Sequence, residues 1–339
     1  MSALAEDAAR TGVLLVNSGT PDAATAPAVR AFLARFLADP RVVDLPRALW
    51  LPLLHLLILP LRPRAVARRY QSIWRDSGSP LRELTLGLRD ALSTALSRGT
   101  TAAPAVEVGM LYSSPDVGAA LARLRAGGVG RLVVLPLFPQ YCGATTGAVS
   151  DHVSTELKRS AYTPQVQFIA HYHDDPAYIE ALRASVAEHW RRHGRTAHLL
   201  ISFHGIPERR VRQGDPYYDE CLETAALLAR ALELTQDEWS VSFQSRFGPA
   251  GWLKPYTSAV LAAMPGRGAR EVTVVCPGFA VDCLETLEEI AIENRRVFLG
   301  AGGQRYDYVP ALNASTGHAL CLAQLIGRHA ARSTTATGA

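Results

Sequence analysis

Three glutamates recur at intervals of four residues in the C-terminal half of the chain: Glu285, Glu289 and Glu293. Apolar residues at helical spacing predict a helix over residues 284–298, and residues four apart share a helix face. Like charges at that spacing destabilise a helix by about 0.2–0.5 kcal/mol per pair, so this glutamate series needs solvent or a cation. One interpretation is a solvated acidic face, with Asp282 and Glu285 favoured near the helix N-terminus by its dipole. The other is a path for a metal ion or protons.

His204 is a second candidate for a chemical role. Residues 199–203 form an apolar run, and His204 follows directly, before a turn at Gly205 and Pro207. In open α/β sheets, ligands bind beyond the carboxyl ends of the strands. A neutral imidazole there can accept a proton or bind a metal. The structural alternative is a core histidine that is hydrogen-bonded to the backbone.

These two segments resemble the ferrochelatases, the enzymes that insert ferrous iron into a porphyrin late in haem synthesis. Further matching motifs extend over nearly the whole chain and occur in the family's order. The matching motifs are Leu15-Val16-Asn17-Ser18-Gly19-Thr20-Pro21, Gly78-Ser79-Pro80-Leu81, Leu135-Pro136-Leu137-Phe138-Pro139-Gln140-Tyr141, Ser202-Phe203-His204-Gly205-Ile206-Pro207, Phe243-Gln244-Ser245-Arg246-Phe247-Gly248, Trp252-Leu253-Lys254-Pro255-Tyr256-Thr257 and Cys276-Pro277-Gly278-Phe279 with Asp282-Cys283-Leu284-Glu285.

The resemblance assigns roles to particular residues. It implies that His204 and Glu285 are catalytic. The implied metal-binding residues are His204, Glu285, Glu289, Glu293 and Asp282, with Asp282 orienting the others. The implied porphyrin-binding residues are Trp252, Tyr70, Arg62, Ser18, Ser79, Tyr112 and Thr145.

This chain departs from the family pattern at three places. Ser18 stands where Met, Leu or Tyr is more usual, and Pro63 directly follows Arg62, so Arg64 is a possible substitute. Cys283 stands where many eukaryotic members have histidine, which leaves the carboxylates to form the metal path.

Metal insertion requires stripping water from iron, distorting the macrocycle and removing two pyrrole protons. Carboxylate oxygens hold Fe(II) loosely, which suits a transfer path. Iron is thus a substrate, and no further cofactor is expected. Whether His204 accepts a proton or ligates iron stays open.

The strand and helix pattern predicts an α/β fold of two related halves with parallel sheets. The resemblance implies two Rossmann-like domains, with the porphyrin pocket in the cleft between them. We expect the first domain at residues 12–151, the second at 152–312 and a terminal helix at 313–328. Residues 1–11 and 329–339 are expected to be flexible ends.

A long insertion at residues 41–80 interrupts the first half, and loops of such length are usually functional. Its segment 49–61 is very apolar, yet shorter than the ~20 residues that span a bilayer. A buried core helix is one interpretation. The preferred one is an exposed lip that borders the porphyrin and makes peripheral membrane contact, with Trp50 as its interfacial anchor.

Composition narrows the class of protein. A formal charge of +4 without clustered Lys/Arg tracts argues against nucleic acid, and the arginines around Arg62 adjoin the apolar segment instead. Five cysteines without CxxC spacing argue against a disulfide framework. Some ferrochelatases carry an iron–sulfur cluster on a cysteine-rich C-terminal extension, and none is expected for a tail such as residues 333–339. Residues 1–10 lack a signal-peptide pattern, so we expect a cytoplasmic protein.

The apolar lip favours protoporphyrin IX over coproporphyrin, because four propionates would require more cations. A cobalt or sirohydrochlorin chelatase is an alternative enzyme, and a non-catalytic porphyrin or haem carrier is an alternative of another class. A carrier would not need His204 and Glu285 together with an acidic series. A phosphate-binding Rossmann enzyme is disfavoured because no GxGxxG follows a strand.

Overall fold

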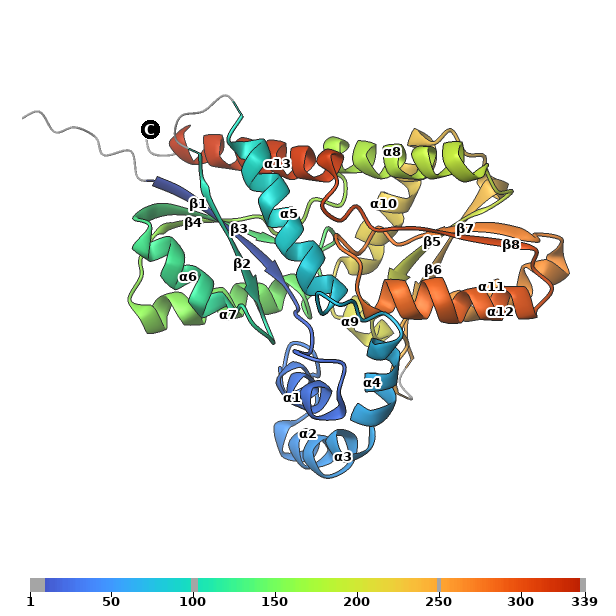
Figure 1. Ribbon diagram of the computed structural model, residues 1–339, viewed down its shortest axis with the longest axis horizontal. Coiled ribbons are helices and arrows are strands. Elements are labelled where there is room, and N and C mark those ends of the chain that lie inside the picture. The colour runs from blue at the N-terminus through green and yellow to red at the C-terminus, as the bar shows by residue number, and fades with distance from the viewer. Residues whose placement is uncertain (1–9, 99–102, 249–250, 336–339) are drawn as a thin grey trace, which may run out of the picture.

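The computed structural model describes residues 10–98, 103–248 and 251–335, with side chains described as far as residue 330. Within these residues the strands form two four-stranded parallel sheets (Figure 1). The first has the order β2 (Ala105–Met110), β1 (Arg10–Asn17), β3 (Val129–Pro136) and β4 (Gln165–Phe168). The second has the order β6 (Trp239–Gln244), β5 (Leu199–His204), β7 (Glu271–Val275) and β8 (Arg305–Val309). The matching orders confirm the predicted α/β class with parallel sheets.

Helices provide the crossovers that parallel strands require. Those of the first half are α5 (Pro80–Leu96), α6 (Val117–Ala126) and α7 (Thr146–Ser160), and α8 (Pro176–His193) leads into the second. The second half contains α9 (Glu208–Arg212), α10 (Tyr217–Ala231), α11 (Thr257–Ala263), the π-helix η4 (Glu285–Asn294), α12 (Arg295–Gly300), and two 3₁₀ turns at Gln236–Glu238 and Pro265–Arg267. The terminal helix is α13 (Thr316–Thr335), and it packs against α5 and α8.

The predicted domain boundary at residues 151/152 is wrong. Residues 131–134 of β3 pair with β4, so the first sheet continues to Phe168. The four residues of β4 lie at the edge of the sheet, and Gln165 and Gln167 interrupt their apolar pattern. Such a short strand gives little sequence signal. The predicted flexible ends also need correction, because Arg10 and Thr11 pair with β3 and the terminal helix continues past residue 329.

A single apolar cluster joins the two sheets. It includes Val13 and Val133 from the first sheet and Ile201 and Phe203 from the second, all of them fully buried. Domains that share only a small polar interface usually move relative to one another, whereas a large apolar interface opposes such motion. The shared core therefore holds the two sheets in a fixed relation, and with them the side chains at the strand ends.

Helices α1 (Ala26–Phe36), α2 (Arg47–Leu53), α3 (Leu59–Leu61) and α4 (Pro63–Gln71) project below the two sheets in Figure 1. A five-residue π-helix, η1 (Leu54–Ile58), joins α2 to α3. The apolar lip, residues 49–61, occupies this projection. Its outer leucines Leu49, Leu56 and Leu61 are 72%, 79% and 66% exposed.

The inner face of the apolar lip is buried. Leu54, Leu59 and Trp50 pack with Leu37, and the Trp50 indole N–H donates to the Leu37 carbonyl oxygen at 2.6 Å. The prediction of Trp50 as an interfacial anchor is therefore wrong, because its ring and its polar atom both face inward. Within the described residues no single helix has the length and apolarity to cross a membrane. Residues 47–61 and Pro63–Gln71, bent by 52°, meet that requirement only as a pair.

Candidate active site

His204 ends β5, beside Gln244 of β6, at the carboxyl edge of the second sheet. Its Nδ1 lies 2.6 Å from the carbonyl oxygen of Gly205. A carbonyl oxygen only accepts, so Nδ1 carries the proton and Nε2 of the neutral ring keeps its lone pair. The rings of Trp252 and Phe279 flank the imidazole, each with its centroid 6.4 Å away. The position supplies a half-buried base between two aromatic side chains.

The glutamate series lies on η4, a ten-residue π-helix, where the sequence predicted an ordinary helix. Hydrogen bonds in a π-helix run from residue i to i+5, so each turn takes in one residue more than an α-turn. Residues four apart consequently stay on one side, as the spacing predicted. Extended π-helices are rare, and π-segments occur frequently at functional sites.

Glu289 makes a polar contact that the sequence did not predict. The backbone N–H and the hydroxyl of Ser245 donate to its two carboxylate oxygens at 2.7 and 2.6 Å. Burial raises the pKa of the Glu289 carboxyl, while the Ser245 hydrogen bonds and nearby His204 oppose the rise and Glu285 adds to it. Glu289 therefore lies within electrostatic range of both predicted catalytic residues.

Ser245 itself has a backbone φ of +64°, in the left-handed region that non-glycine residues seldom adopt. The neighbouring Gln244 is buried, and its Nε2 donates to the backbone oxygen of Glu285 at 3.1 Å. Together they fasten the end of β6 to the start of η4. The Gln244-Ser245 motif was the available sequence signal, but its contact with Glu289 was not foreseeable from one sequence.

An arginine side chain lies at the outer end of the glutamate series. Arg69 of α4 forms an ion pair with Glu288, and its guanidinium lies 3.6 Å from Glu293. Exposure rises along the series: Glu285 and Glu289 are half-buried, whereas the Glu293 side chain is 59% exposed. The carboxylates therefore lead from the vicinity of His204 to solvent, with Arg69 at the outer end.

The carboxylate of Asp282 accepts hydrogen bonds from other residues of the protein. Its Oδ1 accepts from the Tyr308 hydroxyl at 2.6 Å and the Thr286 hydroxyl at 2.9 Å, and its Oδ2 accepts from the Asn313 amide at 2.8 Å. The residue is only 3% exposed. These contacts suit the orienting role predicted for Asp282, and direct binding of a metal by its carboxylate stays a prediction. They fix the start of η4.

Tyr70, Trp252 and Arg62 border the site in different ways. Burial and the charge of Glu285 raise the pKa of the Tyr70 phenol, which hydrogen-bonds Thr20. The indole nitrogen of Trp252 is buried and has no partner among the described residues. The Arg62 guanidinium lies 4.2 Å from the centre of the Phe247 ring, a cation–π contact near the surface.

The remaining predicted porphyrin contacts are less exposed or lie elsewhere. Tyr112 is 3% exposed and donates its hydroxyl to Asp39, so it has little surface for a ligand. Ser79 is equally buried and shares a 2.7 Å hydrogen bond with Thr20, behind Tyr70. Direct porphyrin contact by these two residues stays a prediction, and both side chains already have protein partners. Ser18 and Thr145 are half-buried, and no described contact joins them to His204.

Comparison with known proteins identifies the class to which this fold and site belong. Two solved chelatases share the fold. "SirB from Bacillus subtilis with Fe3+" aligns with a TM-score of 0.58 and 11% sequence identity, covering 96% of this chain and 98% of that one. CbiX, described as the terminal enzyme for biosynthesis of siroheme in denitrifying bacteria, aligns with a TM-score of 0.51 and 14% sequence identity, covering 94% of this chain and 98% of that one. At such identities the likeness shows the chelatase fold alone.

Closer relatives define the family. The ferrochelatase family model matches residues 10–330. The ferrochelatase of Aeromonas hydrophila is 50% identical over 95% of this chain and 99% of its own length. The ferrochelatase of Methylococcus capsulatus is 52% identical over 94% of this chain and 96% of its own length. This chain belongs to the ferrochelatase family: it is a metal chelatase of haem synthesis whose substrates are Fe(II) and a porphyrin.

Proposed function

We propose that the porphyrin is protoporphyrin IX, and that the reaction yields protohaem and two protons. The observation that carries this choice is the apolar lip, whose outer leucines are exposed on the insertion next to α4. A ring with two vinyl groups and two propionates fits an apolar border better than one with four propionates. Arg62 and Arg64, both exposed on this side, supply positive charge for two carboxylates.

The residues around His204 suit the proton chemistry of insertion. Nε2 of the neutral imidazole accepts a pyrrole proton, while the hydrogen bond from Nδ1 to Gly205 fixes the tautomer and the ring orientation. Glu285 and Glu289 offer carboxylate oxygens on the same side of η4, through which protons leave or Fe(II) arrives. We place the macrocycle between the Trp252 side and the Tyr70 side of this group.

Parallel assays with two porphyrins test the proposal. Anaerobic Fe(II) is added to protoporphyrin IX or coproporphyrin III with and without the protein, and the rate is followed by visible absorbance. We expect kcat/KM for protoporphyrin to be at least tenfold the larger. Equal values, or a preference for coproporphyrin, would contradict the substrate assignment without affecting family membership. Binding of either ring without turnover would favour the carrier alternative.

The glutamate series gives a graded prediction. Glu289→Gln and Glu293→Gln should raise the KM for Fe(II) more than they lower kcat at saturating iron, since an amide cannot neutralise a passing cation. Because burial raises the Glu289 pKa, its carboxylate becomes protonated at a higher pH than an ordinary glutamate. The KM of the native enzyme for Fe(II) should therefore increase as the pH falls and the Glu289 carboxylate becomes protonated, and Glu289→Gln should abolish this increase. Arg295→Gln, at an exposed position one residue beyond η4, serves as control. Equal rate losses at all iron concentrations would refute a transfer path.

Peripheral membrane contact through residues 49–61, on a cytoplasmic protein, is part of the proposal. Replacing Leu53, Leu56 and Leu57 by serine removes exposed apolar groups, each worth about 1.5–3 kcal/mol if it were fully buried in lipid. We expect weaker flotation with liposomes and weaker porphyrin binding, with little change in melting temperature. Leu54→Ser and Leu59→Ser are the matched controls, because these leucines are buried and their loss should lower stability by several kcal/mol. A sharply lowered melting temperature for the triple variant with unchanged flotation would exclude the membrane surface.

A further inference from the structure

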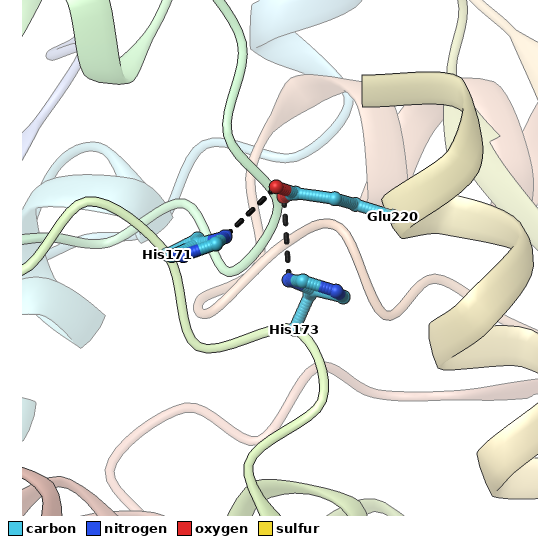
Figure 2. A group of neighbouring side chains, drawn as sticks. All are labelled: His171, His173 and Glu220. Atoms are coloured by element: carbon cyan, nitrogen blue, oxygen red, sulfur yellow. Dashed lines mark hydrogen bonds and ion pairs between the residues drawn. The ribbon is translucent and has the colours of Figure 1, made fainter. Parts of the chain in front are cut away.

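A second group of metal-binding side chains lies on elements that carry neither His204 nor the glutamate series. His171 and His173 occupy the loop between β4 and α8, and Glu220 lies in the first turn of α10 (Figure 2). Nδ1 of His171 is 2.8 Å from Oε1 of Glu220, and Nδ1 of His173 is 3.3 Å from Oε2. One ligand atom from each of the three residues lies within 4.8 Å of the others.

The hydrogen-bond geometry of His173 makes this group suited to a cation. Its Nε2 lies 3.0 Å from Oε2 of Glu223, and a carboxylate only accepts, so Nε2 carries the proton. In the neutral ring Nδ1 then presents a lone pair toward the Glu220 carboxylate. His173 is 5% exposed, and Nδ1 has no hydrogen-bond partner among the described residues. In this arrangement two electron-rich atoms 3.3 Å apart in a buried place need a positive charge between them, which a metal ion or a second ring proton supplies.

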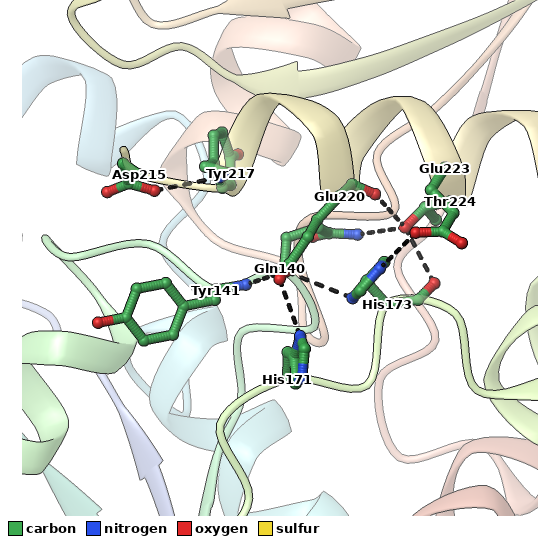
Figure 3. Close-up of polar contacts among 9 residues, drawn as sticks. All are labelled: Gln140, Tyr141, His171, His173, Asp215, Tyr217, Glu220, Glu223 and Thr224. Carbon is green, nitrogen blue, oxygen red and sulfur yellow. Dashed lines mark hydrogen bonds and ion pairs between the residues drawn. The ribbon is translucent and has the colours of Figure 1, made fainter. Parts of the chain in front are cut away.

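Neighbouring groups hold these side chains in position (Figure 3). The Thr224 hydroxyl donates to the backbone oxygen of His173 at 3.0 Å, and the Tyr141 N–H donates to Oε2 of Glu220 at 2.5 Å. Histidines that bind metals generally donate their other ring N–H to a carboxylate or carbonyl, as His173 does to Glu223. The His171 side chain is 53% exposed and so opens the group to solvent.

We propose that His171, His173 and Glu220 bind one divalent transition-metal ion of the Fe(II) or Zn(II) class. Two imidazoles and one carboxylate are a recognised ligand set for both ions, with the remaining positions left to water. The ion would tie the loop that follows the first sheet to helix α10 of the second half. This site is separate from the insertion reaction, since neither His204 nor Glu285 contributes to it.

Zinc titration of protein without a polyhistidine tag tests the site. The starting protein carries His204→Ala and Glu289→Gln to weaken the insertion site, and a chromophoric chelator competes for the metal. We expect one Zn(II) to bind per chain. His171→Ala and Glu223→Gln, at a half-exposed ligand and an exposed supporting carboxylate, should each weaken binding by 10-fold or more. His193→Ala, at an exposed histidine on α8, should leave the affinity unchanged.

These variants keep the test decisive even if removal of buried His173 prevents folding. Absence of bound Zn(II), or native affinity in both His171→Ala and Glu223→Gln, would overturn the proposal. The contacts would then be an ion pair between Glu220 and a protonated His171. Because the readout is stoichiometry and affinity rather than iron insertion, failure here would be distinguishable from failure of the proposed reaction.

Discussion

Replacing His204 by alanine should lower kcat for iron insertion by about 10²- to 10⁴-fold, the usual contribution of a positioned acid or base. The imidazole is the half-buried base at the end of β5, with its Nε2 lone pair left free by the Nδ1 contact to Gly205. Porphyrin binding should persist if, as proposed, flat apolar contacts hold the ring, because Trp252 and Phe279 remain. Stopped-flow or steady-state insertion assays and porphyrin fluorescence quenching measure the two effects separately.

Two further variants sharpen this experiment. Glu285→Gln should cause a loss of similar size, since the amide keeps the side-chain shape but cannot take a proton or neutralise a cation. His193→Ala, at an exposed position on α8, should retain native turnover. Near-native kcat in His204→Ala would exclude the proposed proton transfer. A change confined to porphyrin affinity in Glu285→Gln would make Glu285 a structural residue of η4 instead.

The sequence predicted the parts of the fold that depend on burial. β1, β3, β5 and β7 are central strands with continuous apolar runs, and the run identified at residues 199–203 lies within β5, Leu199–His204. Edge strands β4 and β8 were missed, because they are short and have polar residues among the apolar ones. The domain boundary was misplaced for the same reason, since only backbone pairing shows that β4 belongs to the first sheet.

The site was predictable by residue type but not by conformation. Helical spacing placed the three glutamates on one side, yet an apolar repeat does not distinguish a π-helix from an α-helix. The strained backbone of Ser245 and its two hydrogen bonds to Glu289 depend on a meeting of β6 with η4 that only tertiary structure defines. Trp50 illustrates the opposite error. A tryptophan in an apolar segment suggests a residue at the membrane interface, but the Trp50 indole N–H donates to the backbone oxygen of Leu37 in the protein interior.

Asp282 offers the clearest test of a positioning residue against a ligand. Asp282→Ala would leave the buried Tyr308 and Thr286 hydroxyls and the Asn313 amide without their acceptor. Each buried polar group that loses its partner costs about 1–3 kcal/mol, so the total loss of stability should be on the order of 3 kcal/mol or more. The start of η4 would then be released, and insertion should fall together with the melting temperature.

The near-isosteric Asp282→Asn separates the two roles. An amide keeps one accepting oxygen but presents an N–H₂ group to at least one of the present donors, so thermal stability should drop, by less than in Asp282→Ala. The KM for Fe(II) should change little, because the side chain does not contact the ion in the proposed mechanism. An unchanged melting temperature combined with a strongly raised KM for iron would identify Asp282 as a metal ligand. That result would require donors to the Asp282 carboxylate to move away when iron binds, and this would break hydrogen bonds that fix the first turn of η4.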